Sequence, residues 1–347
     1  MISGSLSRLR LLCLAACLTS LAACRGEGQG FPVRIRVPRG ASFAQVADSL
    51  AARGIIEQPA FLFRLYARIR GADHQVKPGT YAFRPGAGWD RILDDLRLGR
   101  VLTVRVVIPE GWDLRAIAPR LANVTGLPAD SILAALSDTA RARIFGVPGP
   151  TLEGYLYPAT YTLPVDMPLD TIIARMVARY QQIWTPARRA RADSLGLSER
   201  EVVTLASIIE KEAKRRDEMP LISAVYHNRL RIGYFLQADP TVQYALGRHQ
   251  ARLLYPHIDS VADNPYNTYR HPGLPPGPIA SPSVLAIDAA LYPADVDYLY
   301  FVARPDGSHV FTRSLADHNR VKNAIRRGEP LRLDGAAGVA PSPAGTR

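Results

Sequence analysis

Two segments of the chain share one pattern: a short stretch in which apolar and polar residues alternate, followed by apolar residues at helical spacing. Residues 33–47 read VRIRVPRGASFAQVA, and residues 104–118 read VRVVIPEGWDLRAIA. Each begins with an alternating, β-branched run typical of a half-buried strand, followed by a Pro-x-Gly turn. Ser42 and Asp113 then stand where a helix N-cap is expected, ahead of apolar residues at helical spacing. The sequence therefore predicts a repeated strand–turn–helix unit.

Each unit is followed later by an aromatic stretch that begins after a glycine. Residues 77–83 read KPGTYAF, and residues 152–161 read LEGYLYPATY. Tyrosine, phenylalanine and threonine favour strands, so each stretch is predicted to be the strand that completes its unit. Two copies are too few for a solenoid. We expect two small α+β units, the first free-standing and the second leading into a larger domain. Chance recurrence of a common motif is the alternative.

The spacing of apolar residues becomes helical from Leu169 onward. Residues 169–192 predict one long amphipathic helix. Residues 198–215 predict a second helix, and Ser198 with a glutamate three residues later forms a capping box at its start. Residues 217–233 predict a third helix, which ends at a glycine. The larger domain is therefore predicted to be mainly helical.

The rest of the chain mixes an irregular loop with regular elements. Residues 262–282 are too rich in proline for a regular element and too aromatic for a simple linker. A helix is predicted at about 282–291, two strands joined by a turn at 297–312, and a final helix up to Arg327. Residues 332–347 are predicted to be a disordered tail. The predicted fold class is α+β, with a small module followed by a larger mixed, mainly helical domain.

Residues 1–24 have the layout of an export signal. A basic start precedes an apolar run that ends at Ala23 and is shorter than the roughly 20 residues of a spanning helix. The ending Leu-Ala-Ala-Cys24 resembles a bacterial lipoprotein cleavage box, in which the cysteine becomes the lipidated first residue. An uncleaved anchor helix is the alternative. Both interpretations attach the chain to a membrane from outside the cytoplasm, with residues 25–30 as a linker.

Composition narrows the chemistry further. All three cysteines lie within the export signal, so the exported body is predicted to lack disulfides, a cysteine nucleophile and thiolate metal ligands. The 43 lysines and arginines against 31 aspartates and glutamates give a net charge of +12, which would suit an anionic partner. The cations are mostly scattered arginines, without a basic stripe interleaved with aromatics, so no nucleic-acid partner is predicted.

The helix predicted at 198–215 carries two glutamates that point in nearly opposite directions, because successive helical residues turn by about 100°. Glu210 and Lys214 are predicted to form an i,i+4 ion pair on a solvated face. Glu212 falls among leucine and isoleucine side chains. Desolvation raises the pKa of a carboxyl, which is the condition for a general acid near neutral pH. Glu212 is therefore the first candidate for acid catalysis, and a buried salt bridge with an arginine is the alternative.

Other common chemistries are not indicated. The seven histidines show neither H-x-H nor H-E-x-x-H spacing, and the chain has no G-x-S-x-G or P-loop motif, so no metal or cofactor is predicted. Residues 236–244 (LQADPTVQY) and 264–269 (NPYNTY) offer carboxylates beside tyrosines and amides. Such side chains suit sugar rings, which need apolar stacking and many hydrogen bonds. A proline-rich loop packed on the core by its tyrosines is the alternative.

The order of these segments resembles the endolytic murein transglycosylase family (YceG-like, MltG). The matching segments are KPGTY, LEGYLYPATY, LASIIEKE (205–212), NRLRIG (228–233), LQADPTV (236–242), YNTY (266–269), GLPPG (273–277) with Ile279-Ala280, and YLYFV (298–302). The resemblance covers nearly the whole chain after residue 31.

The resemblance implies an enzyme anchored in the inner membrane, with its body in the periplasm, that cuts nascent peptidoglycan glycan strands internally. It implies a LysM-like module at 31–102 and a catalytic domain at 103–331, with its core at 198–327. In the family the second glutamate of the E-K-E triplet is catalytic, which is Glu212 here. The resemblance is also compatible with peptidoglycan synthases as partners.

The mechanism implied by the resemblance uses one carboxyl twice. Glu212 protonates the glycosidic oxygen between N-acetylmuramic acid and N-acetylglucosamine. It then takes the proton of the C6 hydroxyl, which closes on C1 and leaves a 1,6-anhydro end. Since the substrate supplies its own nucleophile, the second carboxylate of ordinary glycosidases is not needed. Candidates for holding the sugar are Gln237, Asp239, Asn267, Tyr269 and Glu153.

Two other functions and two departures from the family remain open. A water-using muramidase would pair Glu212 with Asp239, and a non-enzymatic cell-wall-binding lipoprotein would grip glycan with the repeated units. The family often has an acidic residue where this chain has Ala159, which puts any role for that position in doubt. The N-terminal segment is closer to a lipoprotein signal than to the spanning helix of the family, so the mode of anchoring stays open.

Overall fold

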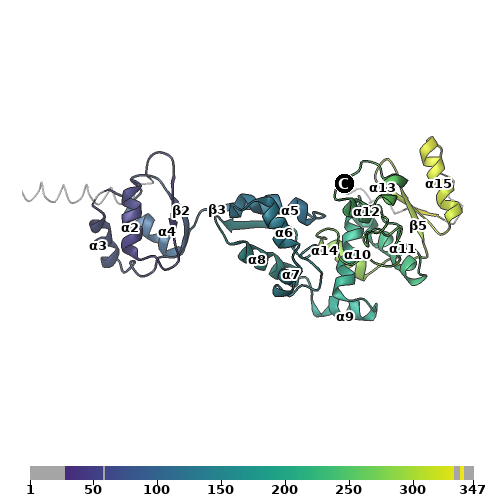
Figure 1. The fold of residues 1–347 in the computed structure, drawn as a ribbon, viewed down its shortest axis with the longest axis horizontal. Helices are drawn as coiled ribbons and strands as arrows, with labels where there is room; N and C mark the ends of the chain where they lie inside the picture. Colours follow the sequence, from purple (N-terminus) through teal and green to yellow (C-terminus); the bar gives the residue numbers. More distant parts are fainter. Residues whose placement is uncertain (1–27, 58, 332–336, 340–347) are drawn as a thin grey trace, which may run out of the picture. The chain divides into compact units, whose positions relative to one another are not determined.

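The structure, a computed structural model, describes residues 28–57, 59–331 and 337–339 (Figure 1). The chain divides into two compact units. The first comprises Met1–Arg105 with Val124–Gly126 and Thr162–Pro168, and the second comprises Val106–Asn123, Leu127–Tyr161 and Leu169–Arg347. The predicted export signal and most of the predicted tail lie outside the described residues.

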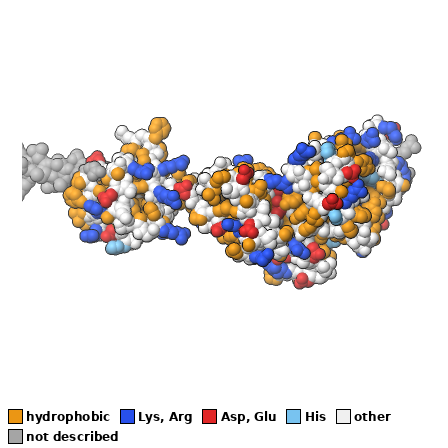
Figure 2. Space-filling view, in the orientation of Figure 1, with side chains coloured by type: hydrophobic (Ala, Val, Ile, Leu, Met, Phe, Trp, Pro, Cys, Tyr) orange, Lys and Arg blue, Asp and Glu red, His pale blue; other side chains and the backbone are white. Residues whose placement is uncertain are grey.

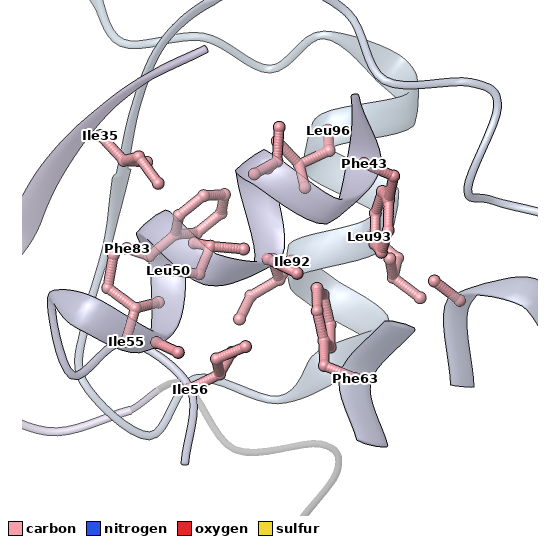
Figure 3. Packing of buried hydrophobic residues seen from close by; sticks show 14 of the residues in the cluster. Ile35, Phe43, Leu50, Ile55, Ile56, Phe63, Phe83, Ile92, Leu93 and Leu96 are labelled. Atoms are coloured by element: carbon pink, nitrogen blue, oxygen red, sulfur yellow. The ribbon is translucent and has the colours of Figure 1, made fainter. Parts of the chain in front are cut away.

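In the first unit, the predicted strand–turn–helix pattern is present. Strand β1 (Val33–Val37) pairs antiparallel with β2 (Gly79–Phe83), and helices α2 (Phe43–Ala52), α3 (Ala60–Ile69) and α4 (Trp89–Leu98) belong to the same unit. Ser42 caps α2 in a capping box with Gln45, which satisfies backbone donors at the helix start. The sheet and all three helices contribute apolar side chains to one core, including Ile35, Leu50, Phe63, Phe83 and Ile92 (Figure 3).

The second copy of the pattern has the same order of elements. Strand β3 (Thr103–Ile108) precedes α5 (Leu114–Thr125), and β4 (Ala159–Pro164) is the partner strand of β3. Asp113 accepts a hydrogen bond from the Ala116 N–H at 2.9 Å, which confirms the predicted N-cap. Helices α6 (Ala129–Leu136) and α7 (Thr139–Ile144) follow α5 along the chain.

The single helix predicted at 169–192 is wrong, because the structure has two helices there. These are α8 (Leu169–Gln181) and α9 (Pro186–Ser194). Thr185 accepts a hydrogen bond from the Arg188 N–H and so caps α9. Proline at the first helical position favours a helix start, and it cannot donate to a preceding turn. The apolar period continues across this break, which is why periodicity alone missed it.

The next elements along the chain are α10 (Glu199–Glu212), the short helix η2 (Arg216–Glu218), α11 (Met219–Arg231), α12 (Asp239–Leu246), α13 (Tyr255–Asp259), α14 (Val284–Leu291), β5 (Tyr300–Ala303), β6 (His309–Thr312) and α15 (Leu315–Arg327). Of these, α10, α11, α14, α15 and the two strands β5 and β6 were predicted, whereas η2, α12 and α13 were not. Gly233, with a φ of +68°, follows the end of α11.

Helix α10 is buried around its whole circumference along its middle. Every residue from Val202 to Ile209 is buried, and α10 packs against α11 and α14. The predicted capping box of Ser198 and Glu201 is present at its start. A helix that is apolar on all sides is stable only inside a protein. The solvated face predicted for α10 is therefore wrong.

The predicted ion pair between Glu210 and Lys214 is also wrong, since no such pair forms within the described residues. Glu210 Oε2 accepts hydrogen bonds from the Ser283 N–H at 3.0 Å and from the Ser283 hydroxyl at 2.5 Å. Ser283 caps α14 by accepting from the Ala286 N–H. Negative charge is favourable at a helix N-terminus, so Glu210 ties the end of α10 to the start of α14.

A small sheet forms from residues near the end of the chain. Strands β5 and β6 make the predicted antiparallel pair, with Phe301 opposite Phe311. A third strand, β7 (Ala337–Val339), pairs with β6. The tail predicted as disordered therefore contributes one strand, and its other residues lie outside the described ones.

Two features are relevant to a basic binding surface and to a membrane span: the charge pattern on the visible face of each unit, and the length of the described helices. Basic side chains are interspersed with acidic and apolar ones over the visible face of each unit (Figure 2). Within residues 28–57, 59–331 and 337–339, none of the helices has both the length and the apolar character needed to cross a bilayer.

Candidate active site

A cavity of about 690 Å³ lies in the second unit, beside the end of α10. Its wall also includes the turn before α5, both ends of α12 and the facing ends of β5 and β6. Its side chains include the acids Glu212 and Asp239, the aromatics Trp112 and Tyr244, and the cations Arg115, Lys211, Lys214 and Arg248. The volume is in the usual range of ligand sites. One ligand could thus meet acid groups, aromatic faces and positive charge together.

Glu212 is the last residue of α10, and its side chain forms part of the cavity wall. The Tyr226 hydroxyl of α11 donates a hydrogen bond to Glu212 Oε1 at 3.0 Å. The pKa of Glu212 is raised to about 7, mainly by burial and then by the negative charge of Asp239. The Tyr226 hydrogen bond and the positive charge of Arg229 act in the opposite direction. At neutral pH this carboxyl can both give and take a proton.

The salt bridge weighed as the alternative for Glu212 is absent from the described part of the chain. Arg229 instead donates to the backbone carbonyls of Leu299 and Leu236. Its guanidinium also lies over the rings of Tyr234 and Tyr300. Arg229 therefore holds neighbouring segments together, and the Glu212 carboxyl remains available to a ligand in the cavity.

Asp239 and Tyr269, two predicted substrate-binding residues, lie together. The Tyr269 hydroxyl donates to Asp239 Oδ1 at 2.5 Å, and Asp239 is an exposed residue of the cavity wall. The segments that carry them are joined through Thr268, whose Oγ1 accepts from the Ala238 N–H at 3.0 Å. Since the charge of Asp239 acts on Glu212, the structure brings these two carboxyls to one site.

Gln237 and Asn267 occupy different surroundings. Gln237 is exposed, has a φ of +48° and is not part of the cavity wall. Asn267 is fully buried, and its amide nitrogen donates to the Ile258 and Val261 carbonyls at 2.9 and 3.0 Å. Its side-chain oxygen accepts from the Tyr269 N–H at 3.1 Å. Every polar atom of the Asn267 side chain thus shapes the loop that presents Tyr269.

Glu153 lies behind the wall of the cavity. It is 3% exposed, and its Oε2 accepts from the Leu114 N–H at 3.1 Å and from the Tyr244 hydroxyl at 3.3 Å. Its Oε1 has no hydrogen-bond partner among the described residues. Burial raises the pKa of Glu153 to about 8. Glu153 therefore contacts Tyr244, which lines the cavity, and is not itself a wall residue.

Sequence reasoning missed Tyr226, Trp112 and the cations of the cavity. One signal was available for Trp112, because it follows the Pro-x-Gly turn of the second copy where the first copy has Ala41. No sequence signal marks Tyr226, since its hydroxyl meets Glu212 only through the packing of α11 against α10. The cavity cations come from segments far apart in the chain, so their convergence could not be read from the sequence.

The described residues contain no group of three or more His, Cys, Asp or Glu side chains placed to hold a metal ion. The cavity wall instead presents one protonatable carboxyl with a second carboxyl nearby, and the buried Tyr226 hydroxyl is bonded to the first from behind the wall. These features define an acid–base site built around a single carboxyl at the end of a buried helix.

Comparison with known proteins agrees with an enzyme that has such an acid–base site. The family model described as the YceG-like family matches residues 35–324 of the chain. The chain belongs to the YceG-like family. A crystal structure of a YceG-like protein from Listeria monocytogenes is 32% identical in sequence, with a TM-score of 0.58. The match covers 84% of this chain and 100% of that one.

Two curated relatives carry the same name. The endolytic murein transglycosylase of Bacillus subtilis strain 168 is 34% identical over 307 residues, which is 84% of this chain and 84% of the relative. The endolytic murein transglycosylase of Streptococcus pneumoniae strain D39 is 28% identical over 318 residues. That match covers 83% of this chain and 57% of the longer pneumococcal protein.

Proposed function

We propose that the protein is an endolytic murein transglycosylase, a lytic enzyme that cuts peptidoglycan glycan strands internally. The relatives of that name support the activity and the substrate. The observation that carries the chemistry is Glu212, with its pKa raised to about 7 at the wall of the cavity and bonded to Tyr226 rather than to an arginine.

The reaction needs one group that acts first as acid and then as base. Protonated Glu212 gives its proton to the glycosidic oxygen between N-acetylmuramic acid and N-acetylglucosamine as the bond from that oxygen to C1 breaks. The C6 hydroxyl oxygen of the same muramic ring bonds to C1, and its proton passes to the Glu212 carboxylate. The product has a 1,6-anhydro end, no water is consumed, and Glu212 is again protonated.

The neighbours of Glu212 support both halves of this cycle. The negative charge of Asp239 raises the Glu212 pKa, which favours the acid form at the start. The same charge would stabilise positive charge that develops at C1. Trp112 and Tyr244 offer faces for sugar rings. Asp239, Tyr269 and the wall cations are the side chains proposed to hold the glycan, and Gln237, Asn267 and Glu153 are proposed to shape the site from outside the wall.

Product analysis distinguishes this function from its rivals. Digestion of purified sacculi should release fragments whose mass shows 1,6-anhydro-muramic ends. Reducing muramic ends would instead indicate a water-using muramidase that pairs Glu212 with Asp239. Binding to sacculi without any soluble fragment would indicate a cell-wall-binding lipoprotein.

Two substitutions beside Glu212, at Asp239 and at Tyr226, should shift the pKa of its carboxyl in opposite directions. Asp239→Asn removes a charge that raises the Glu212 pKa, so the alkaline limb of the kcat/KM profile should move to lower pH. Tyr226→Phe removes a hydrogen bond that lowers this pKa, so the same limb should move to higher pH. Rates of anhydro-product release between pH 5 and 9 measure both. A shift of both variants in the same direction would contradict the assignment.

The proposal extends to the organisation of the chain. Residues 1–24 are an export signal or anchor, 25–30 a linker, 31–102 a LysM-like module and 103–331 the catalytic domain, with the body in the periplasm and the inner membrane as the attachment. Peptidoglycan synthases are the proposed protein partners. The separate core of the first unit supports an independent module.

Lipid attachment at Cys24 has a direct test. Cells grown with an alkyne fatty acid should label the wild-type protein, and Cys24→Ala should lose the label because the thiol that carries the lipid is gone. Cys17→Ala is the matched control, since Cys17 ends the same Leu-Ala-Ala-Cys pattern and should keep the label. An unlabelled wild type that still sediments with membranes would indicate an anchor helix instead.

A further inference from the structure

A buried carboxylate and a buried imidazole form a pair beside the cavity and have no part in the chemistry above. Glu218, the last residue of η2, is 0% exposed, and His309, the first residue of β6, is 3% exposed. His309 Nδ1 lies 2.6 Å from Glu218 Oε2, and the His309 backbone N–H donates to Glu218 Oε1 at 3.0 Å. Both carboxylate oxygens are therefore bonded to the same residue.

The 2.6 Å distance is compatible with either tautomer of His309, and an ionised Glu218 selects one of them. An ionised carboxylate can only accept hydrogen bonds, so the hydrogen between the two side chains belongs to His309 Nδ1. Arg215 Nε lies 3.9 Å from Glu218 Oε1 and partly balances the carboxylate charge. In the neutral imidazole, the other ring nitrogen, Nε2, then carries a lone pair and can accept a hydrogen bond.

His309 also lines the cavity that contains Glu212. Its Nδ1 is occupied by Glu218, and within the described residues its Nε2 has no hydrogen-bond partner. The rings of Phe301 and Phe311 lie 5.4 and 6.2 Å from the imidazole and restrict its rotation. His309 Nε2 is not among the fully enclosed side-chain atoms that lack a partner, so it is accessible from the cavity, where a ligand or water can bond it.

We propose that His309 contacts the glycan and that Glu218 is its positioning residue. His309 Nε2 accepts a hydrogen bond from a hydroxyl or acetamido N–H of a sugar bound in the Glu212 cavity. Glu218 holds the ring in the tautomer that makes this possible. Both roles rest on the proposed function, because that function defines the ligand as a glycan. Replacing both members of a buried hydrogen-bonded pair by apolar groups of similar shape can be nearly neutral for stability, so stability alone does not require this pair.

Three substitutions separate contact with the ligand from a structural role. His309→Asn keeps an amide near Nδ1 that can donate to Glu218 but removes Nε2. His309→Gln places an amide near the position of Nε2. Glu218→Gln keeps the shape of the carboxyl but presents an N–H group to Nδ1, so the imidazole proton should move to Nε2, as in other carboxylate-held histidines.

The expected result is a loss of activity without loss of fold. His309→Asn and Glu218→Gln should each lower kcat/KM about 10- to 100-fold, the range of one lost hydrogen bond to a buried group, and should unfold near the wild-type temperature. His309→Gln should recover part of the activity. Nitrogen-15 NMR of labelled histidine should show Nδ1 protonated in the wild type and Nε2 protonated in Glu218→Gln.

Binding gives a second measurement that does not depend on turnover. An uncrosslinked peptidoglycan tetrasaccharide added to Glu212→Gln should shift the His309 Nε2 resonance in a saturable manner. Two results with His309→Asn would overturn the role of His309: full activity, or a loss of activity no larger than the loss of folded protein. Binding of the tetrasaccharide without a change in the His309 resonance would overturn it as well. Reducing ends from the wild type would instead refute the transglycosylase reaction alone, since the shift on binding would still place His309 at the glycan.

Discussion

Glu212→Gln is expected to lower glycan cleavage by roughly 10³-fold or more, because it removes the group that acts as both acid and base. Glutamine has nearly the same shape and can still accept the Tyr226 hydrogen bond seen at Oε1. The fold should therefore be retained, and loss of the desolvated carboxyl should leave the protein at least as stable at neutral pH. Mass spectrometry of released anhydro-muropeptides measures the first effect, and thermal unfolding followed by circular dichroism measures the second.

The same helix provides a matched control for this experiment. Glu210 lies two residues earlier and bonds to Ser283, outside the cavity wall. Glu210→Gln weakens a tie between α10 and α14, so it should lower the unfolding temperature and leave the rate per folded molecule close to wild type. If Glu212→Gln cleaves sacculi at the wild-type rate, Glu212 has no chemical role and the proposed mechanism fails.

The second large effect is expected on stability, at Glu153. Its pKa is raised from 4.5 to about 8 by burial, so between these values the folded state binds more protons than the unfolded state. Stability due to this group is fully present below about pH 4.5 and is lost as the pH rises through about 8. A shift of this size corresponds to on the order of 5 kcal/mol, since each pKa unit is about 1.4 kcal/mol.

Glu153→Gln should remove this pH dependence. Glutamine resembles the protonated carboxyl, so the variant should match the wild type near pH 4.5 and exceed its free energy of unfolding by several kcal/mol near pH 9. Urea unfolding at a series of pH values measures the difference. Equal stability of the two proteins at pH 9 would show that the buried carboxyl is not desolvated as the structure indicates.

Glu201 is a control with the opposite sign. Its hydrogen bonds to the Ser198 hydroxyl and N–H lower its pKa, so its contribution to stability is present above its unfolded pKa and is lost as the pH falls. Glu201→Gln should therefore weaken the protein at neutral pH and make little difference in acid, whereas Glu153→Gln should act mainly in alkali. If the stability changes of the two variants depend on pH in opposite directions, removal of a negative charge in general cannot explain either of them.

Local signals in the sequence predicted most of the elements. The capping residues Ser42, Asp113 and Ser198 all act as N-caps in the structure, because capping depends on residues three positions apart. The break at Pro186 was missed, since the apolar spacing does not change there. The role of Glu210 was also missed. Its partner Ser283 is far away in the sequence, so only tertiary packing places it beside the carboxyl.

In the candidate site too, some residue roles could be predicted from neighbours in the sequence and others depend on tertiary packing. Glu212 could be ranked first from the sequence because its apolar neighbours three and four residues earlier lie in the same helix and predict desolvation. Asn267 was predicted to hold sugar, and the structure places it in the loop interior instead. An asparagine in a turn suits a ligand and a backbone carbonyl equally well, so residue type could not decide between them.

By itself, the sequence determined the class of fold, the starts of the main helices and the one carboxyl most able to act as an acid, because each depends on neighbours within a few residues. Only the tertiary structure decided that Glu212 meets Tyr226 rather than an arginine, that Asp239 and the scattered cations share its cavity, and that His309 is held by Glu218. These contacts join segments distant in the chain, and the packing that brings them together sets burial, charge and proton position at once.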